Sequence, residues 1–315
     1  MYIALFALAL IPVIALLLII FFLDKKEKEP IGLLTGLFFA GMGTIITAII
    51  IEGIGEFLLN ALFPFGAALK SLVLSIFIIG PAEELGKYAV LRLITWKNKN
   101  FDYSYDAIVY AVFVSLGFAA LENVGYVFSN GIGTAFLRMF TAVPGHACFA
   151  VFMGFFYSKS KYASLTGKKQ DQVKYTILSL VVPIIGHGLY DGIVLSGRDT
   201  NSSIITGLSM LLWIGYVIVI FAVACITIVW SSKHDFCIVT LPDAVQTVYK
   251  PSVAGTWKCM CGAENYSNFC SQCGKQRPLE DKWICPKCGT LSAFRFCGNC
   301  GCPRPAAQPI SGNTP

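Results

Sequence analysis

Charged residues are scarce in this sequence. Asp, Glu, Lys and Arg make up 13% of the 315 residues, whereas 56% of the residues are hydrophobic. A typical soluble globular domain carries about 25% charged residues. The low charge content and the long apolar runs exclude an ordinary soluble domain, and they indicate that most of the chain has the lipid bilayer as its solvent.

The N-terminus lacks the features of a secretory signal peptide. No basic segment precedes the first apolar run, and no small-residue cleavage site stands before Asp24. A signal peptide has both features. We therefore expect the first apolar run to be a retained transmembrane helix.

Several apolar runs are long enough to cross a hydrocarbon core, which takes about 20 mostly apolar residues in a helix. They cover residues 2–23, 31–59, 66–95, 104–128, 132–157, 175–197 and 204–230. The sequence thus predicts an all-α polytopic membrane bundle of about seven transmembrane helices.

Lysines accumulate in the loops that follow the odd-numbered runs. These lysines are Lys25, Lys26, Lys28, Lys97, Lys99, Lys159, Lys161, Lys168, Lys169, Lys174 and Lys233. The loops after the even-numbered runs hold isolated basic residues only, namely Lys70, Arg138 and Arg198. Because Lys and Arg concentrate on the cytoplasmic side of a membrane protein, we expect the N-terminus to lie outside the cell and the C-terminus in the cytoplasm.

Cysteines gather after the last apolar run, in close pairs that repeat with a period of about 27 residues. The pairs are Cys259 and Cys261, Cys270 and Cys273, Cys285 and Cys288, and Cys297 and Cys300. Four thiolates from two tight turns close the tetrahedral shell of a structural zinc ion, and disulfides are disfavoured in the reducing cytoplasm. The sequence therefore predicts a small cytoplasmic domain of two zinc ribbons, with Cys302 left unassigned.

The tail also lacks a dense basic stripe and an array of stacking aromatic residues, so we expect no nucleic-acid partner. A docking or regulatory role toward a cytoplasmic protein partner is favoured instead. The predicted organisation is a membrane domain over residues 1–230, a linker over 231–256, a double zinc ribbon over 257–302 and a flexible tail over 303–315.

Ionisable side chains interrupt four of the predicted spans. A charged group in a bilayer core costs about 2.5–3.5 kcal/mol on insertion scales, so such groups usually mark a functional site. The candidate catalytic residues are Glu83, Glu84, Lys87, Glu122, His146, His187 and Asp191. The first three share one helix face because they lie three or four residues apart, and His187 and Asp191 share a face for the same reason.

Each of these residues taken alone has a structural alternative. A Glu–Lys pair one turn apart can be a simple ion pair, a lone His can be a packing residue, and Asp191 can be solvated near an interface. Glu52 and Glu56, near the end of the second span, are interpreted as solvated. The whole set argues for a site, because no structural need requires so many ionisable groups at similar depth.

The four motifs that carry these residues resemble those of the PrsW-type intramembrane proteases, a branch of the broad group that includes the CAAX prenyl proteases. They are Glu83-Glu84-x-x-Lys87, Phe118-x-x-x-Glu122, His146 after Pro144-Gly145, and His187-x-x-x-Asp191. The CAAX-type enzymes have an Arg where this sequence has Tyr88, so the lysine favours the PrsW branch.

The resemblance covers roughly residues 30–230 and implies an enzyme of a bacterial cell membrane. Such an enzyme cleaves a peptide bond in or next to the membrane segment of a protein substrate, for which an anti-sigma factor is one candidate. The zinc-ribbon tail is not part of the core family pattern, so the identity of the substrate does not transfer.

The residues leave two mechanisms open. In the first, Glu83 or Glu84 is the general base that activates water, while His146 and His187 stabilise the oxyanion or protonate the leaving amine. In the second, which is favoured, Glu84, His146 and His187 hold a catalytic divalent metal ion. In both, the lysine of the first motif balances the buried charge and Asp191 orients His187.

Two other classes of function compete with the protease. Carboxylates at mid-membrane depth in broken helices also serve ion-coupled transporters, but no inverted repeat is evident between the two halves of the chain. A membrane-anchored zinc-ribbon scaffold or sensor would leave the polar residues of four spans unexplained.

Overall fold

The computed structural model describes residues 2–64, 66–238, 257–259, 261–265, 271–273, 283–285, 289, 291–292 and 302. Its contacts divide the chain into two units, Met1–Phe236 and Cys237–Pro315. The two units are described separately below.

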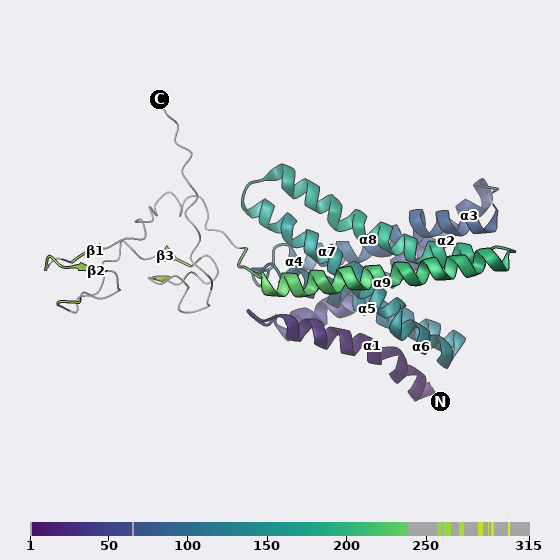
Figure 1. The fold of residues 1–315 in the computed structure, drawn as a ribbon, viewed down its shortest axis with the longest axis horizontal. Helices are drawn as coiled ribbons and strands as arrows, with labels where there is room; N and C mark the ends of the chain where they lie inside the picture. The colour runs from purple at the N-terminus through teal and green to yellow at the C-terminus, as the bar shows by residue number, and fades with distance from the viewer. Residues whose placement is uncertain are drawn as a thin grey trace, which may run out of the picture. The chain divides into compact units, whose positions relative to one another are not determined.

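The first unit is built from helices (Figure 1). They are α1 (Tyr2–Leu23), α2 (Ile31–Leu62), α3 (Ala67–Leu74), the π-helical turn η1 (Ser75–Ile79), α4 (Gly80–Thr95), α5 (Asp106–Asn130), α6 (Ile132–Phe140), α7 (Ala142–Leu165), α8 (Lys169–Arg198) and α9 (Ser203–Lys233). Within the described residues, six helical segments are long and apolar enough to cross a membrane: α1, α2, α5, α6 with α7, α8 and α9. The span expected over residues 66–95 is present as three successive pieces, α3, η1 and α4.

The π-helical turn has a local cause in the sequence. Pro81 has no backbone N–H, and its ring would clash with the carbonyl group four residues earlier if a regular helix continued through it. The chain widens before this residue, so that the Gly80 N–H bonds to the Ser75 carbonyl five residues back. Pro81 then stands in the first turn of α4, where a missing N–H has no consequence.

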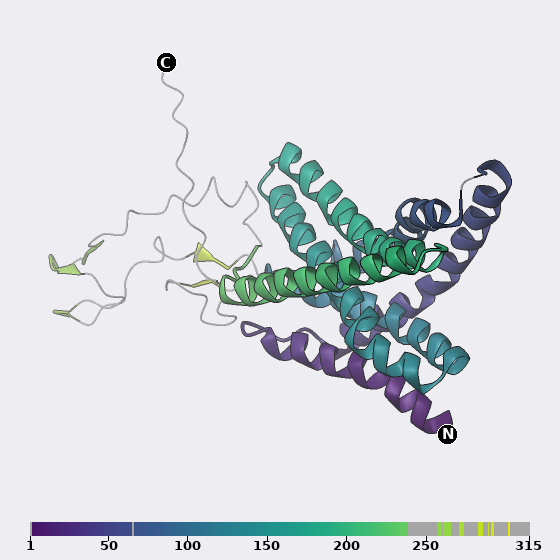
Figure 2. The same ribbon diagram turned by 45° about the vertical axis from the view of Figure 1, so that its right-hand side comes forward.

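Helix α5 is the central helix of the bundle. It contacts α1, α2, α4, α6 and α7, and 83% of its most apolar stretch is buried, against 22% in α1 and in α9. Figure 2 shows α1 and α9 on the outside of the bundle. Apolar side chains that a bundle leaves exposed need lipid around them, so α1 and α9 provide much of the lipid-facing surface.

Two helices extend further than their apolar runs. Helix α7 ends at Leu165 and α8 begins at Lys169, whereas the sequence predicted that these spans would end at residue 157 and begin at residue 175. Hydropathy marks the hydrocarbon core, but the backbone hydrogen bonds continue into the polar residues beyond it. Figure 1 shows the two helices as an antiparallel pair joined by this short connection.

One end of the first unit gathers most of the lysine-bearing loops, and we call it the lysine-rich end. The Ser232 side chain there donates to the Leu23 carbonyl (2.5 Å), and the Ser104 backbone N–H donates to the Phe236 carbonyl (2.9 Å). Lys161 donates to the Trp96 carbonyl. These contacts bring the ends of α1, α4, α7 and α9 together at the lysine-rich end.

In the second unit the described residues include two short antiparallel ladders. Strands β1 (Trp257–Lys258) and β2 (Glu264–Asn265) pair with each other, as do β3 (Trp283–Ile284) and β4 (Leu291–Ser292). Between the strands of each pair, Gly262 and Gly289 have positive φ angles of 91° and 70°, which L-residues with side chains rarely adopt.

Candidate active site

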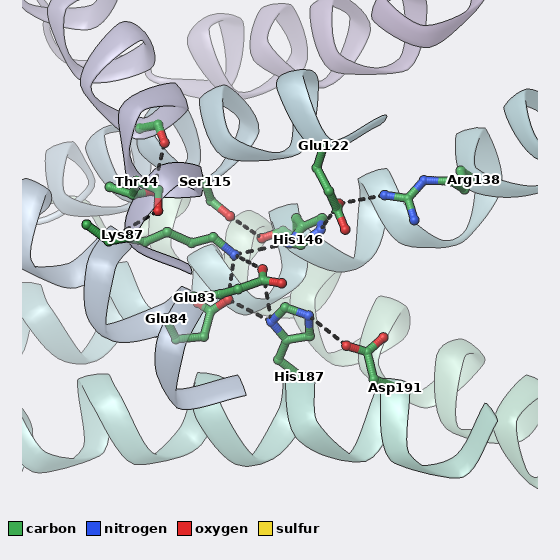
Figure 3. A network of polar contacts seen from close by, with 12 residues as sticks. Thr44, Glu83, Glu84, Lys87, Ser115, Glu122, Arg138, His146, His187 and Asp191 are labelled. Atoms are coloured by element: carbon green, nitrogen blue, oxygen red, sulfur yellow. Dashed lines mark hydrogen bonds and ion pairs between the residues drawn. The ribbon is translucent and has the colours of Figure 1, made fainter. Parts of the chain in front are cut away.

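Four donor side chains from three helices meet inside the bundle (Figure 3). Glu83 and Glu84 come from α4, His146 from α7 and His187 from α8. Each offers one atom to a group in which all atoms lie within 4.8 Å of one another. All four residues are buried, with at most 5% of any one exposed. We call these four residues the donor set.

Lys87 projects into the donor set from one turn further along α4. Its Nζ lies 2.9 Å from Glu83 Oε2 and 2.8 Å from Glu84 Oε1, and it donates to His146 Nδ1 at 3.3 Å. The ammonium also lies 4.1 Å from the centre of the Phe118 ring, a contact in which the ring face attracts the cation. Lys87 thus offsets part of the negative charge of Glu83 and Glu84. Its contact with Phe118 places the first residue of the second motif beside the donor set.

Glu122 fixes His146 from the other side. Its Oε2 accepts from His146 Nε2 (2.9 Å) and from Arg138 Nη2 (2.5 Å), as Figure 3 shows. A neutral imidazole has one N–H. With that hydrogen on Nε2, the lone pair of His146 Nδ1 faces the donor set, which is the orientation a metal ligand needs.

His187 lies between two carboxylates. Its Nδ1 is 2.9 Å from Glu84 Oε1, and its Nε2 is 3.3 Å from Asp191 Oδ2. A neutral imidazole can donate to only one of them. Both contacts can be hydrogen bonds only when one of the three groups carries an extra proton, and a cation bound to both Nδ1 and Glu84 would replace the first of them.

Glycines allow the segments that carry these residues to approach closely. A Cβ atom on Gly80 would lie 2.8 Å from the Ile184 carbonyl oxygen of α8, and one on Gly188 would lie 2.7 Å from the Cα atom of Ile76 in η1. Since Gly188 follows His187 directly, this contact sets how near the imidazole comes to Glu84. The hydroxyl of Tyr216 in α9 also donates to the Gly186 carbonyl (2.6 Å) and holds the same turn of α8 from outside.

The donor set has the chemistry of a divalent cation site. Two imidazoles and carboxylates are common zinc ligands. Glu84 Oε2 is buried and has no hydrogen-bond partner among the described residues, and a buried carboxylate oxygen left unpaired is unfavourable. The ion-paired carboxylates Glu83, Glu84, Glu122 and Asp191 face two side-chain cations, Lys87 and Arg138, which leaves two negative charges when all four are ionised. A divalent cation bound here would give Glu84 Oε2 a partner and would neutralise the two remaining negative charges.

A cavity of about 450 Å³ opens beside the donor set. Glu83, His146 and His187 line it, whereas Glu84 does not and is fully buried. The cavity extends toward the ends of α5 and α8 opposite the lysine-rich end, where Asn130 and Leu195 line it. The cavity therefore gives access to Glu83 but not to Glu84.

The structure brings all seven candidate catalytic residues into one network, and it adds two residues that the sequence did not single out. Arg138 from α6 neutralises Glu122 and also donates to the Asn123 side chain (2.8 Å). Glu52 from α2 lines the cavity, and its Oε1 has no hydrogen-bond partner among the described residues, although the sequence analysis interpreted it as solvated near the end of its span. Its position one helical turn before the exposed Glu56 held no signal that it faces the site.

In the tail, the thiols of Cys259, Cys261 and Cys273 form a second group that could hold a metal ion. The Sγ atoms of Cys259 and Cys273 are 3.5 Å apart. In the other predicted ribbon, Cys285 is described and is buried. The remaining predicted ligands, Cys270, Cys288, Cys297 and Cys300, lie outside the described residues.

Comparisons with known proteins give a consistent result. The model of the PrsW family intramembrane metalloproteases matches residues 29–226. The chain is 34% identical over 205 residues to Protease PrsW of Oceanobacillus iheyensis, which covers 64% of this chain and 88% of the relative. It is 32% identical over 204 residues to Protease PrsW of Bacillus subtilis, with shares of 65% and 88%. No solved structure matches the chain.

Proposed function

Because this chain belongs to the PrsW family of intramembrane metalloproteases, we propose that it hydrolyses a peptide bond in or next to the membrane segment of a protein substrate. One observation carries the proposal: two imidazoles and two carboxylates from three helices meet beside a cavity of about 450 Å³ inside an apolar bundle. The family match favours this function over the transporter and the scaffold that the sequence left open.

Glu84, His146 and His187 would hold a divalent cation. Two imidazoles and one carboxylate are the protein ligands of a large class of catalytic zinc sites. When bound, the cation supplies Lewis-acid polarisation of the scissile carbonyl and activation of the attacking water. Glu122 and Asp191 would hold the two rings in the required orientation, since each accepts from the ring nitrogen that faces away from the donor set.

Glu83 would be the general base, since it borders the cavity and Glu84 does not. Its carboxylate takes a proton from water as the water oxygen bonds to the carbonyl carbon. It then gives that proton to the amine nitrogen as the C–N bond breaks. The Lys87 ammonium, 2.9 Å from Glu83 Oε2, would keep the carboxylate oriented while the charges change.

We propose that the lysine-rich end faces the cytoplasm, because Lys and Arg concentrate on that side of membrane proteins. The cavity then opens toward the outer surface, and the tail after α9 lies in the cytoplasm. A substrate would present a bond near the outer end of its membrane segment. An anti-sigma factor, the candidate that the family resemblance suggested, is one substrate of this kind.

We propose that the tail binds structural zinc and docks or regulates a cytoplasmic protein partner. Cys-rich units of this size bury too little apolar surface to fold alone, so metal binding supplies their folding free energy. The clustering of Cys259, Cys261 and Cys273 supports this proposal for the first unit.

Comparative proteomics tests the protease function. Membrane fractions of cells that express the native chain, a Glu83→Gln variant or a Glu56→Gln variant would be searched for protein fragments with new termini. Glu56 is an exposed carboxylate of α2 that lies outside the cavity, so its variant serves as the matched control. Fragments should appear with the native chain and the control, and the uncleaved precursors should accumulate with Glu83→Gln at equal expression.

Persistence of every fragment in the Glu83→Gln cells would contradict the proposed base. If no membrane-protein fragment depends on the native chain, uptake assays in vesicles would test the transporter instead.

A further inference from the structure

A second cavity, of about 320 Å³, lies at the lysine-rich end between α7, α8 and α9. None of the candidate catalytic residues lines it, and the proposed protease function does not use it. We call it the lysine-rich cavity. Its walls combine basic, aromatic and hydroxyl side chains, which are the groups that bind phosphate esters.

Two lysines supply positive charge to the lysine-rich cavity. Lys159 lies on α7 and Lys168 immediately before α8. Among the described residues, neither ammonium lies within ion-pair distance of a carboxylate. Asp171 also lines the cavity, so the two lysines leave one net positive charge among the lining Lys and Asp residues.

Aromatic side chains form much of the remaining wall. Lys159 Nζ lies 4.6 Å from the centre of the Phe155 ring and 5.6 Å from that of Tyr175, which together hold the ammonium at the cavity. The indole of Trp230 lines the cavity as well. Trp and Tyr are enriched where a membrane protein meets the headgroup layer, so this cavity has the composition expected at the membrane surface.

A serine in the wall of the lysine-rich cavity lacks a hydrogen-bond partner. Ser231 is 8% exposed, and its Oγ is buried without a partner among the described residues. Buried hydroxyls are normally hydrogen-bonded, and an exception calls for a partner that the protein does not itself supply. A ligand oxygen at this position would accept the Ser231 proton.

We infer that the lysine-rich cavity binds a phosphate ester, with the phosphate between Lys159 and Lys168, the Ser231 hydroxyl donating to it and the aromatic wall covering its organic part. The headgroup of an anionic phospholipid and a small soluble phosphate share this chemistry. The position at the end of the transmembrane helices places the cavity where headgroups lie. Binding there would tie the lysine-rich ends of α7, α8 and α9 together.

Thermal unfolding of the full-length chain in a neutral detergent tests the inference. Separate arms contain phosphatidylglycerol, phosphatidylcholine, glycerol 3-phosphate or inorganic phosphate. A ligand that binds only the folded state raises Tm in a concentration-dependent way. We expect phosphatidylglycerol to raise Tm and phosphatidylcholine to have little effect.

Three variants locate the binding site. The pair Lys159→Gln with Lys168→Gln should weaken the apparent affinity for phosphatidylglycerol by about 30-fold, from the attraction of two basic residues to an anionic surface. Ser231→Ala should weaken it less and keeps the experiment informative if the lysine pair folds poorly. The control pair Lys169→Gln with Lys174→Gln removes the same charge from exposed positions of α8 that do not line the cavity, and it should behave like the native chain.

Each outcome decides something. If glycerol 3-phosphate or inorganic phosphate stabilises the native chain as much as the lipid does, and the lysine pair abolishes that effect, the site stands and its ligand is soluble. If phosphatidylglycerol stabilises the lysine pair as much as the native chain, or if no phosphate compound raises Tm, the inference is overturned. Cleavage activity does not enter the measurement, so failure here leaves the proposed function untouched.

Discussion

Glu83 and Glu84 are neighbours in the sequence, but they face different surroundings. Successive helix residues point about 100° apart, so Glu83 borders the cavity while Glu84 is fully buried between Lys87 and His187. The proposed base and the proposed metal ligand are therefore adjacent residues on different faces of α4. A single buried ammonium holds both carboxylates in place.

This separation predicts different effects for the two amide variants. Glu84→Gln should lose one bound metal ion per chain together with activity, because an amide is a much poorer ligand than a carboxylate. Glu83→Gln should keep the metal and lower the rate of reporter cleavage by about 10²–10⁴-fold, the usual contribution of a general base. Elemental analysis and cleavage rates would be measured on the same samples. Loss of metal from Glu83→Gln alone would reverse the assignment.

The sequence singled out candidate site residues within apolar runs, because an ionisable side chain stands out there. Arg138 lies in the last turn of α6, and Glu52 belongs to none of the four motifs, so nothing marked either residue as part of the site. The role of Arg138 depends on α6 folding back onto α5, which brings it to Glu122, 16 residues earlier. No periodicity within one helix reports such a contact.

Glu29 gives the fold a pH dependence that can be measured. It lies in the loop between α1 and α2, is 4% exposed and accepts from the Tyr110 hydroxyl at 2.6 Å. Burial raises its pKa to about 7, against about 4.3 for an unperturbed Glu. The folded state therefore holds the proton more tightly than the unfolded state does. The stability from this group is complete below about pH 4.3 and is lost as the pH rises through about 7.

We expect Glu29→Gln to flatten this dependence. Glutamine keeps an oxygen that can accept from Tyr110 but carries no charge. The variant should gain Tm relative to the native chain at pH 8 and match it near pH 4. Unfolding curves across this range provide the measurement, with the exposed Glu56→Gln as control. A parallel loss of Tm in the native chain and in Glu29→Gln would assign the pH dependence to other groups.

Among the elements, the least predictable was the segment that carries Glu83 and Glu84. The sequence indicated one span over residues 66–95, and the structure has α3, η1 and α4 there. Pro81 explains why the helix changes. The form of the change depends on α8, because Gly188 and Gly80 allow η1 and α8 to touch backbone to backbone. The helix propensity of residues 66–95 contains no information about their contact with α8.

This contact predicts that Gly188→Ala will impair the site from outside it. The new methyl group would lie 2.7 Å from the Cα atom of Ile76, so η1 and α8 must move apart and lengthen the 2.9 Å contact between His187 and Glu84. A displacement of about 1 Å at a catalytic group can lower the rate by about 100-fold. Cleavage and Tm would both be measured. The control is Gly215→Ala in α9, where a Cβ would have no neighbour within 4 Å, and it should leave the cleavage rate and Tm unchanged. Full activity of Gly188→Ala would show that the close approach of η1 and α8 is dispensable.

For the whole molecule, composition and cysteine spacing predict a membrane bundle followed by a Cys-rich tail. The chain's contacts divide at residue 236, and the family match ends at residue 226, before any of the tail cysteines. The cavities could not be predicted, because each depends on how several helices pack against one another. The family thus accounts for the bundle, and the tail requires an explanation of its own.

The tail proposal predicts a change in substrate use rather than in chemistry. Cys259→Ser combined with Cys273→Ser removes two thiols that lie 3.5 Å apart and should lower the zinc content by about one ion per chain, since four thiolates hold one zinc. If the tail docks a substrate or its partner, KM for the full-length substrate should rise while kcat stays the same, and a short reporter that contacts only the bundle should be cut as before. Cys225→Ser, which changes an exposed cysteine of α9, is the matched control.

Two outcomes would contradict the tail proposal. Equal losses of kcat on both substrates would mean that the tail acts on the catalytic site itself. An unchanged zinc content would mean that Cys259 and Cys273 bind no metal.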